Sequence, residues 1–501
     1  MKIPVWHKVA DDTQGIEVSR QRFVALLGVL GLIGIAVSLG QGDFALFAVI
    51  IAVPVVFMAL LAMLSSPLVM FFAVFVFNYF VMGFMRYVDS GGISVLMDIF
   101  LWLQLLLIIT HKVLKRDHEW GRAVNLLTVM SLVWTLYCVL ELVNPSAVFE
   151  AWLMSRRLIY QGFMMALIVS LLFTYFKQVR WLVILYSVLT LLAIAKVLVQ
   201  YKFGFDDYEM AWLINSESIK THILYGGSVI RYFSFFTDAG NFGSNMGCAG
   251  IIFMILALYE KKPGLRIYYC IVGLLSIYAM FLSGTRGAMI VPLAGLALYT
   301  VLSKNFKAMA AGGLLLAGLY VFFAFTYIGE GNPLIRRMRT AFRPSEDASF
   351  QVRMHNQAAL REYLKSKPFG EGVGLGGVEN RKYAYRVTTM IPHDSWYVKI
   401  WMETGIIGLI LYVGILVAVM LKCCYTVMYK IKHRLLCGYL IALLCGTFGL
   451  LVSAYGNAFL GQFPTMLIVF TFLGIAIRGS EIDSATLAAD PSAGKPKVIE
   501  Q

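Results

Sequence analysis

The stretch IYYCIVGLLSIYAMFLSGTRGAMIVPLAGLALYTVLS, residues 267–303, places one arginine between two apolar runs. Each run is close to the roughly 20 residues needed to cross a hydrocarbon core. Lipid offers no water to satisfy backbone polar groups, so runs of this kind fold as helices. Arg286 therefore lies where two predicted helices meet at the edge of a membrane, and a charge at that depth indicates a function.

Similar apolar runs recur along the whole chain of 501 residues, of which 59% are hydrophobic and 14% charged. This composition excludes an ordinary soluble globular domain. It predicts an all-α, polytopic integral membrane protein with about 12–14 transmembrane helices. The candidate spans lie at residues 23–40, 44–62, 68–85, 93–110, 123–143, 158–176, 181–199, 241–259, 266–283, 287–303, 308–327, 397–421, 435–453 and 461–477.

The lysine and arginine residues of the short loops predict the orientation. They gather before the first span and after the fourth, sixth, eighth, tenth and twelfth, with Arg156 and Arg157 as the clearest exception. Cationic residues near span ends are retained in the cytoplasm. Both termini are therefore predicted to be cytoplasmic, and the long segments 200–239 and 328–396 to lie on the outer side.

Hydropathy divides the chain into six regions. They are a cytoplasmic tail that is not a cleaved signal (1–22), N-terminal transmembrane helices (23–199), central transmembrane helices with arginine motifs (200–327), a large outer loop (328–396), C-terminal transmembrane helices (397–478) and a cytoplasmic tail (479–501). The last region has little apolar content and is predicted to be disordered. The seven cysteines lack the spacing of zinc ligands, so no metal site is predicted.

The large outer loop contains two recognisable segments. The first, SEDASFQVRMHNQAALREYLKSKP, predicts an amphipathic helix with Ser345 as N-cap, suited either to cover a cavity or to pack on the domain. The second, PFGEGVGLGG, follows a helix and a proline, which favours a compact turn over a phosphate-binding loop. The loop carries more basic than acidic residues. The surplus positive charge either attracts anions or belongs to a solvated surface without a ligand.

Three residues from distant parts of the chain fall at the same outer interface: Arg231, Arg286 and His393. An arginine at a span end can extend to the headgroups, and an interfacial histidine can bond to backbone, so each has a purely structural alternative. Together these residue types suit a transfer reaction in which a pyrophosphate leaves and a hydroxyl group attacks. Guanidinium groups bind phosphate oxygens in pairs, and an imidazole can take a proton from a hydroxyl. Asp394 and Asp238 are candidates to orient these groups or to cap helices.

Four stretches now resemble a known family, the O-antigen ligase and O-antigen polymerase superfamily of bacterial polyprenyl-pyrophosphate-dependent glycosyltransferases. They are SGTRGAM (283–289), RYFSFFTDAGNFG (231–243), ASFQVRMHNQAALREYLKSKPFGEGVGLGG (348–377) and HDSWYVKIWMETGIIGLILY (393–412). The resemblance covers roughly residues 225–420. It departs from the family pattern at Asp394, where asparagine is common, and in a helix count above the usual twelve or so.

The resemblance implies a GT-C-like fold whose large loop is periplasmic, in the bacterial inner membrane. It implies an enzyme without metal or other cofactor that moves a glycan from undecaprenyl pyrophosphate to an acceptor hydroxyl, of the lipid A-core type for a ligase. Arg231 and Arg286 resemble the pyrophosphate-binding arginines of the family, Arg353 a further loop arginine, and His393 the proposed general base. We expect the two arginines and the histidine to line one cavity.

The leading hypothesis is therefore an O-antigen ligase-like glycosyltransferase of lipopolysaccharide biosynthesis. An O-antigen or exopolysaccharide polymerase and a protein O-oligosaccharyltransferase share the donor site and remain alternatives. A transporter or flippase of lipid-linked sugars is the alternative of another class, with Glu141 and Lys196 as its conspicuous intramembrane charges. The expected partners are the lipid-linked donor, a glycolipid or glycan acceptor and the bilayer, with no nucleic acid.

Overall fold

The computed structural model describes residues 63–87, 93–116, 119–224, 227, 229–304, 306–342 and 348–489. The chain divides into two compact units, Met1–Met70 and Phe71–Gln501. The predicted tail 1–22 and the predicted spans 23–40 and 44–62 belong to the first unit and lie outside the described residues. The second unit holds every predicted site residue.

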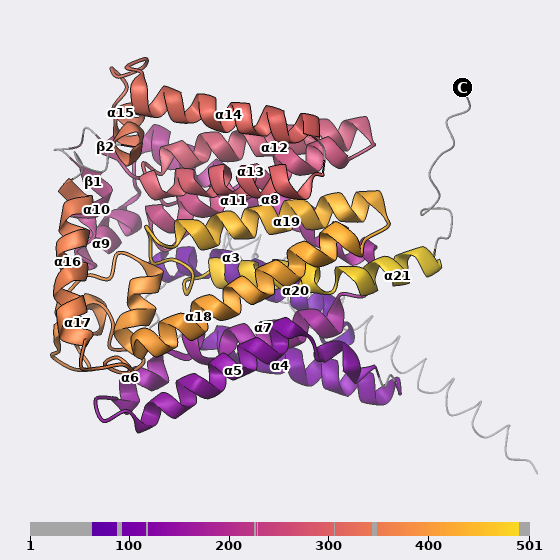
Figure 1. Cartoon of the computed structure of the whole chain (residues 1–501), viewed down its shortest axis with the longest axis horizontal. Coiled ribbons are helices and arrows are strands. Elements are labelled where there is room, and N and C mark those ends of the chain that lie inside the picture. Colours follow the sequence, from indigo (N-terminus) through magenta and orange to yellow (C-terminus); the bar gives the residue numbers. More distant parts are fainter. Residues whose placement is uncertain are drawn as a thin grey trace, which may run out of the picture. The chain divides into compact units, whose positions relative to one another are not determined.

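Helices form nearly all of the described structure (Figure 1), which confirms the all-α prediction. The α-helices are α3 (Pro67–Tyr87), α4 (Ile93–Leu114), α5 (Leu126–Leu140), α6 (Phe149–Met154), α7 (Gly162–Leu172), α8 (Phe176–Phe203), α9 (Asp207–Asn215), α10 (Ile219–His222), α11 (Ala239–Tyr259), α12 (Pro263–Leu282), α13 (Ile290–Leu302), α14 (Phe306–Phe325), α15 (Pro333–Arg339), α16 (Ala348–Leu364), α17 (Val387–Met390), α18 (Trp396–Tyr429), α19 (Arg434–Ser453), α20 (Thr465–Ile477) and α21 (Gly479–Ala489). Strands β1 (Ile223–Leu224) and β2 (Val229–Ile230) form an antiparallel hairpin in which Ile223 pairs with Ile230.

Among the described residues, eight helices are long and apolar enough to cross a membrane, or nine if α20 and α21, bent by 60°, form one span. A helix lies at each of the twelve predicted spans that are described. Three of them are shorter apolar helices, Arg157–Leu172, Arg286–Leu302 and Met309–Phe325. Length and composition alone therefore support fewer spans here than the predicted 12–14. The chain is a multi-pass membrane protein.

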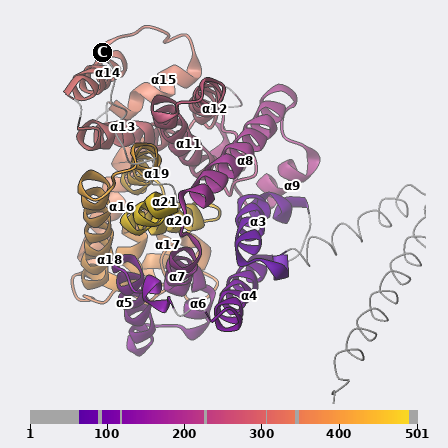
Figure 2. The same ribbon diagram turned by 90° about the vertical axis from the view of Figure 1, so that its right-hand side faces the viewer.

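The core lies around α11. This helix buries 83% of its most apolar 18-residue window, whereas α5 and α18 each bury 33%. It packs on α12 and α19, and α19 packs on α13 (Figure 2). Small residues permit this approach, because a Cβ on Gly243 would stand 2.8 Å from Ser283 Cβ and 3.0 Å from Ala288 Cβ. The loop between α12 and α13 is thereby pressed against the first turns of α11.

The elements that do not span gather at one end of the second unit. Helices α6, α9, α10, α15, α16 and α17 and the β1–β2 hairpin lie together on the left of Figure 1. Helix α16 begins at Ala348, and Ser345, its predicted N-cap, lies outside the described residues. The glycine-rich segment forms buried turns, which confirms the prediction of a compact turn. A Cβ on Gly370, whose φ is +76°, would stand 2.7 Å from the backbone nitrogen of Thr404, so the segment packs directly on the start of α18.

The prediction of a disordered tail at 479–501 is wrong for its first part, where α21 forms. The carboxylate of Asp483 accepts hydrogen bonds from the backbone nitrogens of Lys432 (3.0 Å) and His433 (2.9 Å), and Ile482 is buried. These contacts with the start of α19 outweigh the polar composition of the segment. Residues 490–501 lie outside the described residues.

Candidate functional site

The SGTRG motif, residues 283–287, joins three parts of the chain at the end of the second unit where the short helices lie. Arg286 opens the short helical turn η5 (Arg286–Met289) between α12 and α13. The hydroxyl of Thr285 donates a hydrogen bond to the carbonyl of Ala239, the first residue of α11 (3.0 Å), and is 4% exposed. Arg286 Nη1 donates to Thr340 Oγ1 (3.0 Å) in the turn η6 (Thr340–Phe342) of the large loop. The motif therefore ties the core helix to the loop.

Arg231 reaches the same motif from the hairpin. It follows β2 directly, and its guanidinium donates from Nη2 to Thr285 Oγ1 (2.9 Å) and from Nη1 to the carbonyl of Thr221 (2.8 Å). Its backbone nitrogen donates to the carbonyl of His222 (2.8 Å). These bonds fix the arginine between the hairpin and the SGTRG motif.

The electrostatic surroundings of Arg231 bring the other arginines into the same cluster. Burial and, to a lesser extent, the positive charges of Arg337, Arg286 and Arg353 lower the pKa of Arg231 to about 10, while Asp238 opposes them. Like charges act on a pKa only at short range, so Arg337, Arg286 and Arg353 each lie within range of Arg231. Two of these four arginines come from outside the large loop and two from within it. We call Arg231, Arg286, Arg337 and Arg353 the arginine cluster.

Arg337 is a further residue at this site that the sequence did not lead us to predict. It lies on α15, and its Nε donates to the carbonyl of Gly284 (2.7 Å), the glycine of the SGTRG motif. The sequence signal was the run RRMR at 336–339, but nothing in the pattern indicates which of its arginines faces the motif. Arg339, in the same run, instead donates to the carbonyl of Ile328 (2.8 Å).

Arg353 connects the arginine cluster with His393. Its Nε lies 3.6 Å from Asp394 Oδ2, and Arg353, His393 and Asp394 line a small cleft between α16 and the start of α18. The cleft has a volume of about 10 Å³, close to the space for one water. Neither Arg231 nor Arg286 lines it. That the two arginines and the histidine line one cavity therefore stays a prediction.

His393 lies in a buried, charged environment. Its Nδ1 is 3.6 Å from Glu379 Oε2, and Lys399 Nζ holds the other carboxylate oxygen of Glu379 at 3.0 Å. Burial and, to a lesser extent, the charge of Lys399 lower the pKa of His393 to about 4, against the opposing charges of Glu379 and Asp394. The imidazole is therefore neutral at neutral pH and able to accept a proton. Glu379 and Lys399 were not predicted: Glu379 lies outside the quoted stretches, and nothing in the stretch 393–412 that contains Lys399 indicates that its side chain faces Glu379.

Asp238, a candidate orienting residue, is the N-cap of α11. Its Oδ1 accepts hydrogen bonds from the backbone nitrogens of Gly240 (2.6 Å) and Asn241 (2.9 Å). Its negative charge also raises the pKa of Arg231. It therefore caps the core helix and partly balances the arginine cluster. Among the described residues, no three histidine, cysteine, aspartate or glutamate side chains gather to hold a metal ion.

A family model described as O-antigen ligase matches residues 271–413. Over these residues the chain is similar to the O-antigen ligase family, and we call residues 271–413 the ligase-family segment. The ligase-family segment contains Arg286, Arg337, Arg353 and His393, whereas Arg231 precedes it. A search of the curated proteins found no match.

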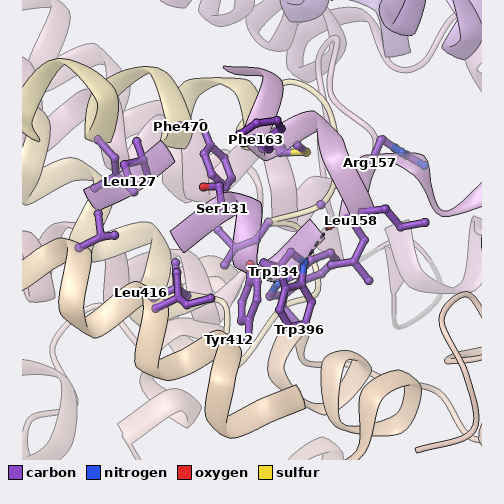
Figure 3. Close-up of a pocket in the computed structure, with 18 residues that line it drawn as sticks. Leu127, Ser131, Trp134, Arg157, Leu158, Phe163, Trp396, Tyr412, Leu416 and Phe470 are labelled. Atoms are coloured by element: carbon purple, nitrogen blue, oxygen red, sulfur yellow. Dashed lines mark hydrogen bonds between the residues drawn. The ribbon is translucent and has the colours of Figure 1, made fainter. Parts of the chain in front are cut away.

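The ligase-family segment also supplies one wall of an apolar cleft (Figure 3). The cleft, of about 50 Å³, lies between α5, α7, α18 and α20, and Trp396 of α18 stands three residues after His393. The rings of Trp134, Trp396 and Tyr412 meet at its centre, where Trp396 Nε1 donates to the hydroxyl of Tyr412 (3.0 Å). Such a surface suits an alkyl or isoprenoid chain.

A larger cavity of about 540 Å³ lies where the segment's glycine-rich turn meets the end of α5. It is lined by Tyr137, Leu140, Glu141, Val143, Asn144, Pro145, Ser146, Ser366, Lys367, Pro368, Phe369 and Gly370. The carboxylate of Glu141 accepts a hydrogen bond there from Asn144 Nδ2 (3.1 Å). Lys367 is paired with Glu371 Oε2 (2.7 Å). Hydroxyl, amide and carboxylate groups beside two aromatic rings are the groups that bind polyhydroxylated ligands.

Proposed function

We propose that this protein is a metal-independent glycosyltransferase that moves a glycan from undecaprenyl pyrophosphate to an acceptor hydroxyl at the periplasmic face of a bacterial inner membrane. The observation that supports it most is the arginine cluster, because the positive charges of Arg337, Arg286 and Arg353 all act on the buried Arg231 and such a concentration of positive charge attracts an anion. A diphosphate offers the paired oxygens that guanidinium groups bind. The family match restricts the reaction class further.

The proposed step needs only these side chains. The acceptor oxygen bonds to the anomeric carbon of the donor glycan while the bond from that carbon to the pyrophosphate oxygen breaks. The electron pair leaves with the pyrophosphate, whose growing negative charge the arginine cluster stabilises. His393 takes the proton of the acceptor hydroxyl, as its low pKa keeps it unprotonated at the start.

The two cavities have chemistry that suits the two substrates. The apolar cleft beside Trp396, of about 50 Å³, has room for only a short part of the donor's isoprenoid chain, and the larger cavity beside Glu141 takes sugars of the acceptor. A ligase, a polymerase and a protein O-oligosaccharyltransferase would share the donor side and differ on the acceptor side. We favour the ligase type, with lipid A-core as acceptor, on the family description.

The transporter alternative rests on Glu141 and Lys196, and both are engaged locally. Lys196 Nζ lies 3.1 Å from Asp206 Oδ2 and 2.9 Å from Glu209 Oε1. Glu141 accepts from Asn144. Neither contact favours a coupling ion or a transported sugar over a structural role.

The test incubates purified protein with undecaprenyl-pyrophosphate-linked glycan and an acceptor glycolipid, and measures the covalent product. Arg286→Ala should abolish the product, whereas Arg361→Ala, an exposed arginine on α16, should leave it. Movement of the donor across vesicle membranes without any covalent product would instead support the transporter.

A further inference from the structure

A histidine that accepts a proton on one ring nitrogen must carry its own proton on the other. A neutral imidazole has one N–H and one lone pair, and the partner of the N–H decides which nitrogen is which. If His393 takes the acceptor proton on Nε2, Nδ1 must be protonated and must have an acceptor for that proton. The structure identifies which group stands there.

The carboxylate of Glu379 faces Nδ1. Nδ1 is buried without a hydrogen-bond partner, and Glu379 Oε2 lies 3.6 Å away, slightly beyond hydrogen-bond distance. Lys399 Nζ holds the other oxygen of Glu379 at 3.0 Å. Contacts of this kind are often long in the absence of substrate and shorten when charge develops.

The backbone at Gly377 is shaped around this pair. Its φ is +98°, and a Cβ there would stand 2.6 Å from Glu379 Oε2 and 2.7 Å from His393 Cε1. The backbone nitrogen of Gly377 donates to the carbonyl of Thr388 (2.9 Å), which holds the chain in this position. Only glycine leaves room for the carboxylate and the imidazole to face each other here.

We propose that Glu379 is a positioning residue for His393, fixing its proton on Nδ1 and stabilising the imidazolium that forms during glycan transfer. This inference rests on the proposed function, in which His393 is the general base. The proton of the acceptor hydroxyl moves to Nε2 and the Nδ1 proton stays on the ring, so Glu379 remains a carboxylate throughout. Lys399 keeps the carboxylate turned toward the ring.

The charges around His393 give this role a pH signature. Glu379 and Asp394 raise the pKa of His393 and Lys399 lowers it, while Arg353, in the same cleft, is paired with Asp394. The pKa of Glu379 is itself lowered, since Lys399 and His393 outweigh its burial, so the carboxylate is ionised at neutral pH. Removing the Glu379 charge should therefore move the acid limb of activity to lower pH. Removing the Lys399 charge should move it to higher pH.

The experiment compares Glu379→Gln, Glu379→Asp and Lys399→Met in the full-length protein, using the transfer assay from about pH 3 upward, below the pKa of His393 of about 4. Glu379→Gln should lower kcat roughly tenfold to a hundredfold, within the effect of general-base catalysis, with the KM for the donor unchanged. Glu379→Asp should recover part of the loss. Glu362→Gln, an exposed carboxylate paired with Lys365 on α16, is the matched control and should behave as the unaltered protein.

The outcomes separate this inference from the function on which it depends. If His393→Ala loses transfer but Glu379→Gln keeps its kcat and its acid limb, Glu379 is not the positioning residue. Loss in Glu379→Gln through a raised donor KM, with no movement of the acid limb, also overturns the inference in favour of a structural role. If His393→Ala keeps full activity, the base assignment itself fails.

Discussion

Thr285 offers the sharpest test of how Arg231 is held. Its hydroxyl accepts from Arg231 Nη2 (2.9 Å) and donates to the carbonyl of Ala239 (3.0 Å) in a buried position. Thr285→Val keeps the shape and removes both bonds. A hydrogen bond to a charged group contributes about 1.5–3 kcal/mol and a neutral one about 1 kcal/mol, so the local loss is about 2.5–4 kcal/mol.

Part of that lost free energy should appear as weaker binding of the donor. If misplacement of Arg231 costs about 1.4 kcal/mol of donor binding, the KM for the donor rises about tenfold. Thr285→Ser retains the hydroxyl and should keep most of the donor affinity. The assay is the dependence of transfer rate on donor concentration, together with thermal unfolding of the purified protein. Equal donor KM values for the valine and serine variants would refute the reasoning.

Three further predictions follow from single contacts. Asp238→Ala should destabilise the protein by about 1 kcal/mol in thermal unfolding, and Asp238→Asn by much less, because asparagine also caps helices; equal losses would show that the cap is not the cause. Gly377→Ala should lower the free energy of unfolding by about 1–2 kcal/mol, because Gly377 has a positive φ, and it should also reduce transfer. Gly264→Ala, where the new Cβ meets open space, should change neither the stability nor the transfer rate. The folded pKa of His393, about 4, lies below its ordinary 6.5, so the unfolded chain takes up the proton first as pH falls. Stability should therefore decline from about pH 6.5 toward pH 4, and His393→Gln should make that decline shallower in pH-dependent unfolding.

The sequence predicted the helical framework because hydropathy alone dictates helices in lipid. It also selected Arg231 and Arg286, since charges beside apolar runs are conspicuous, and the family resemblance added Arg353. It did not identify Arg337 or Glu379. Their roles depend on contacts with Gly284 and His393 that arise only once the large loop has folded back on the motif.

The same limit explains the tail. A segment rich in alanine and serine, beginning at Gly479, folds as α21 because Asp483 binds the backbone at the start of α19. The predicted common chamber depends on side-chain directions in the loop, and a hydropathy pattern carries no such information. Arg353 is paired with Asp394, beside His393, and its charge also acts on the pKa of Arg231.

The central claim is that the arginine cluster binds one diphosphate. A double-mutant cycle on Arg231→Ala and Arg286→Ala, read as the affinity of the purified protein for undecaprenyl pyrophosphate in nanodiscs, tests it most directly. Groups that share one ligand show interaction energies of about 0.5–3 kcal/mol, so we predict that the double variant binds the diphosphate with an affinity that departs from the sum of the single losses. Unchanged affinity in both single variants would contradict the account.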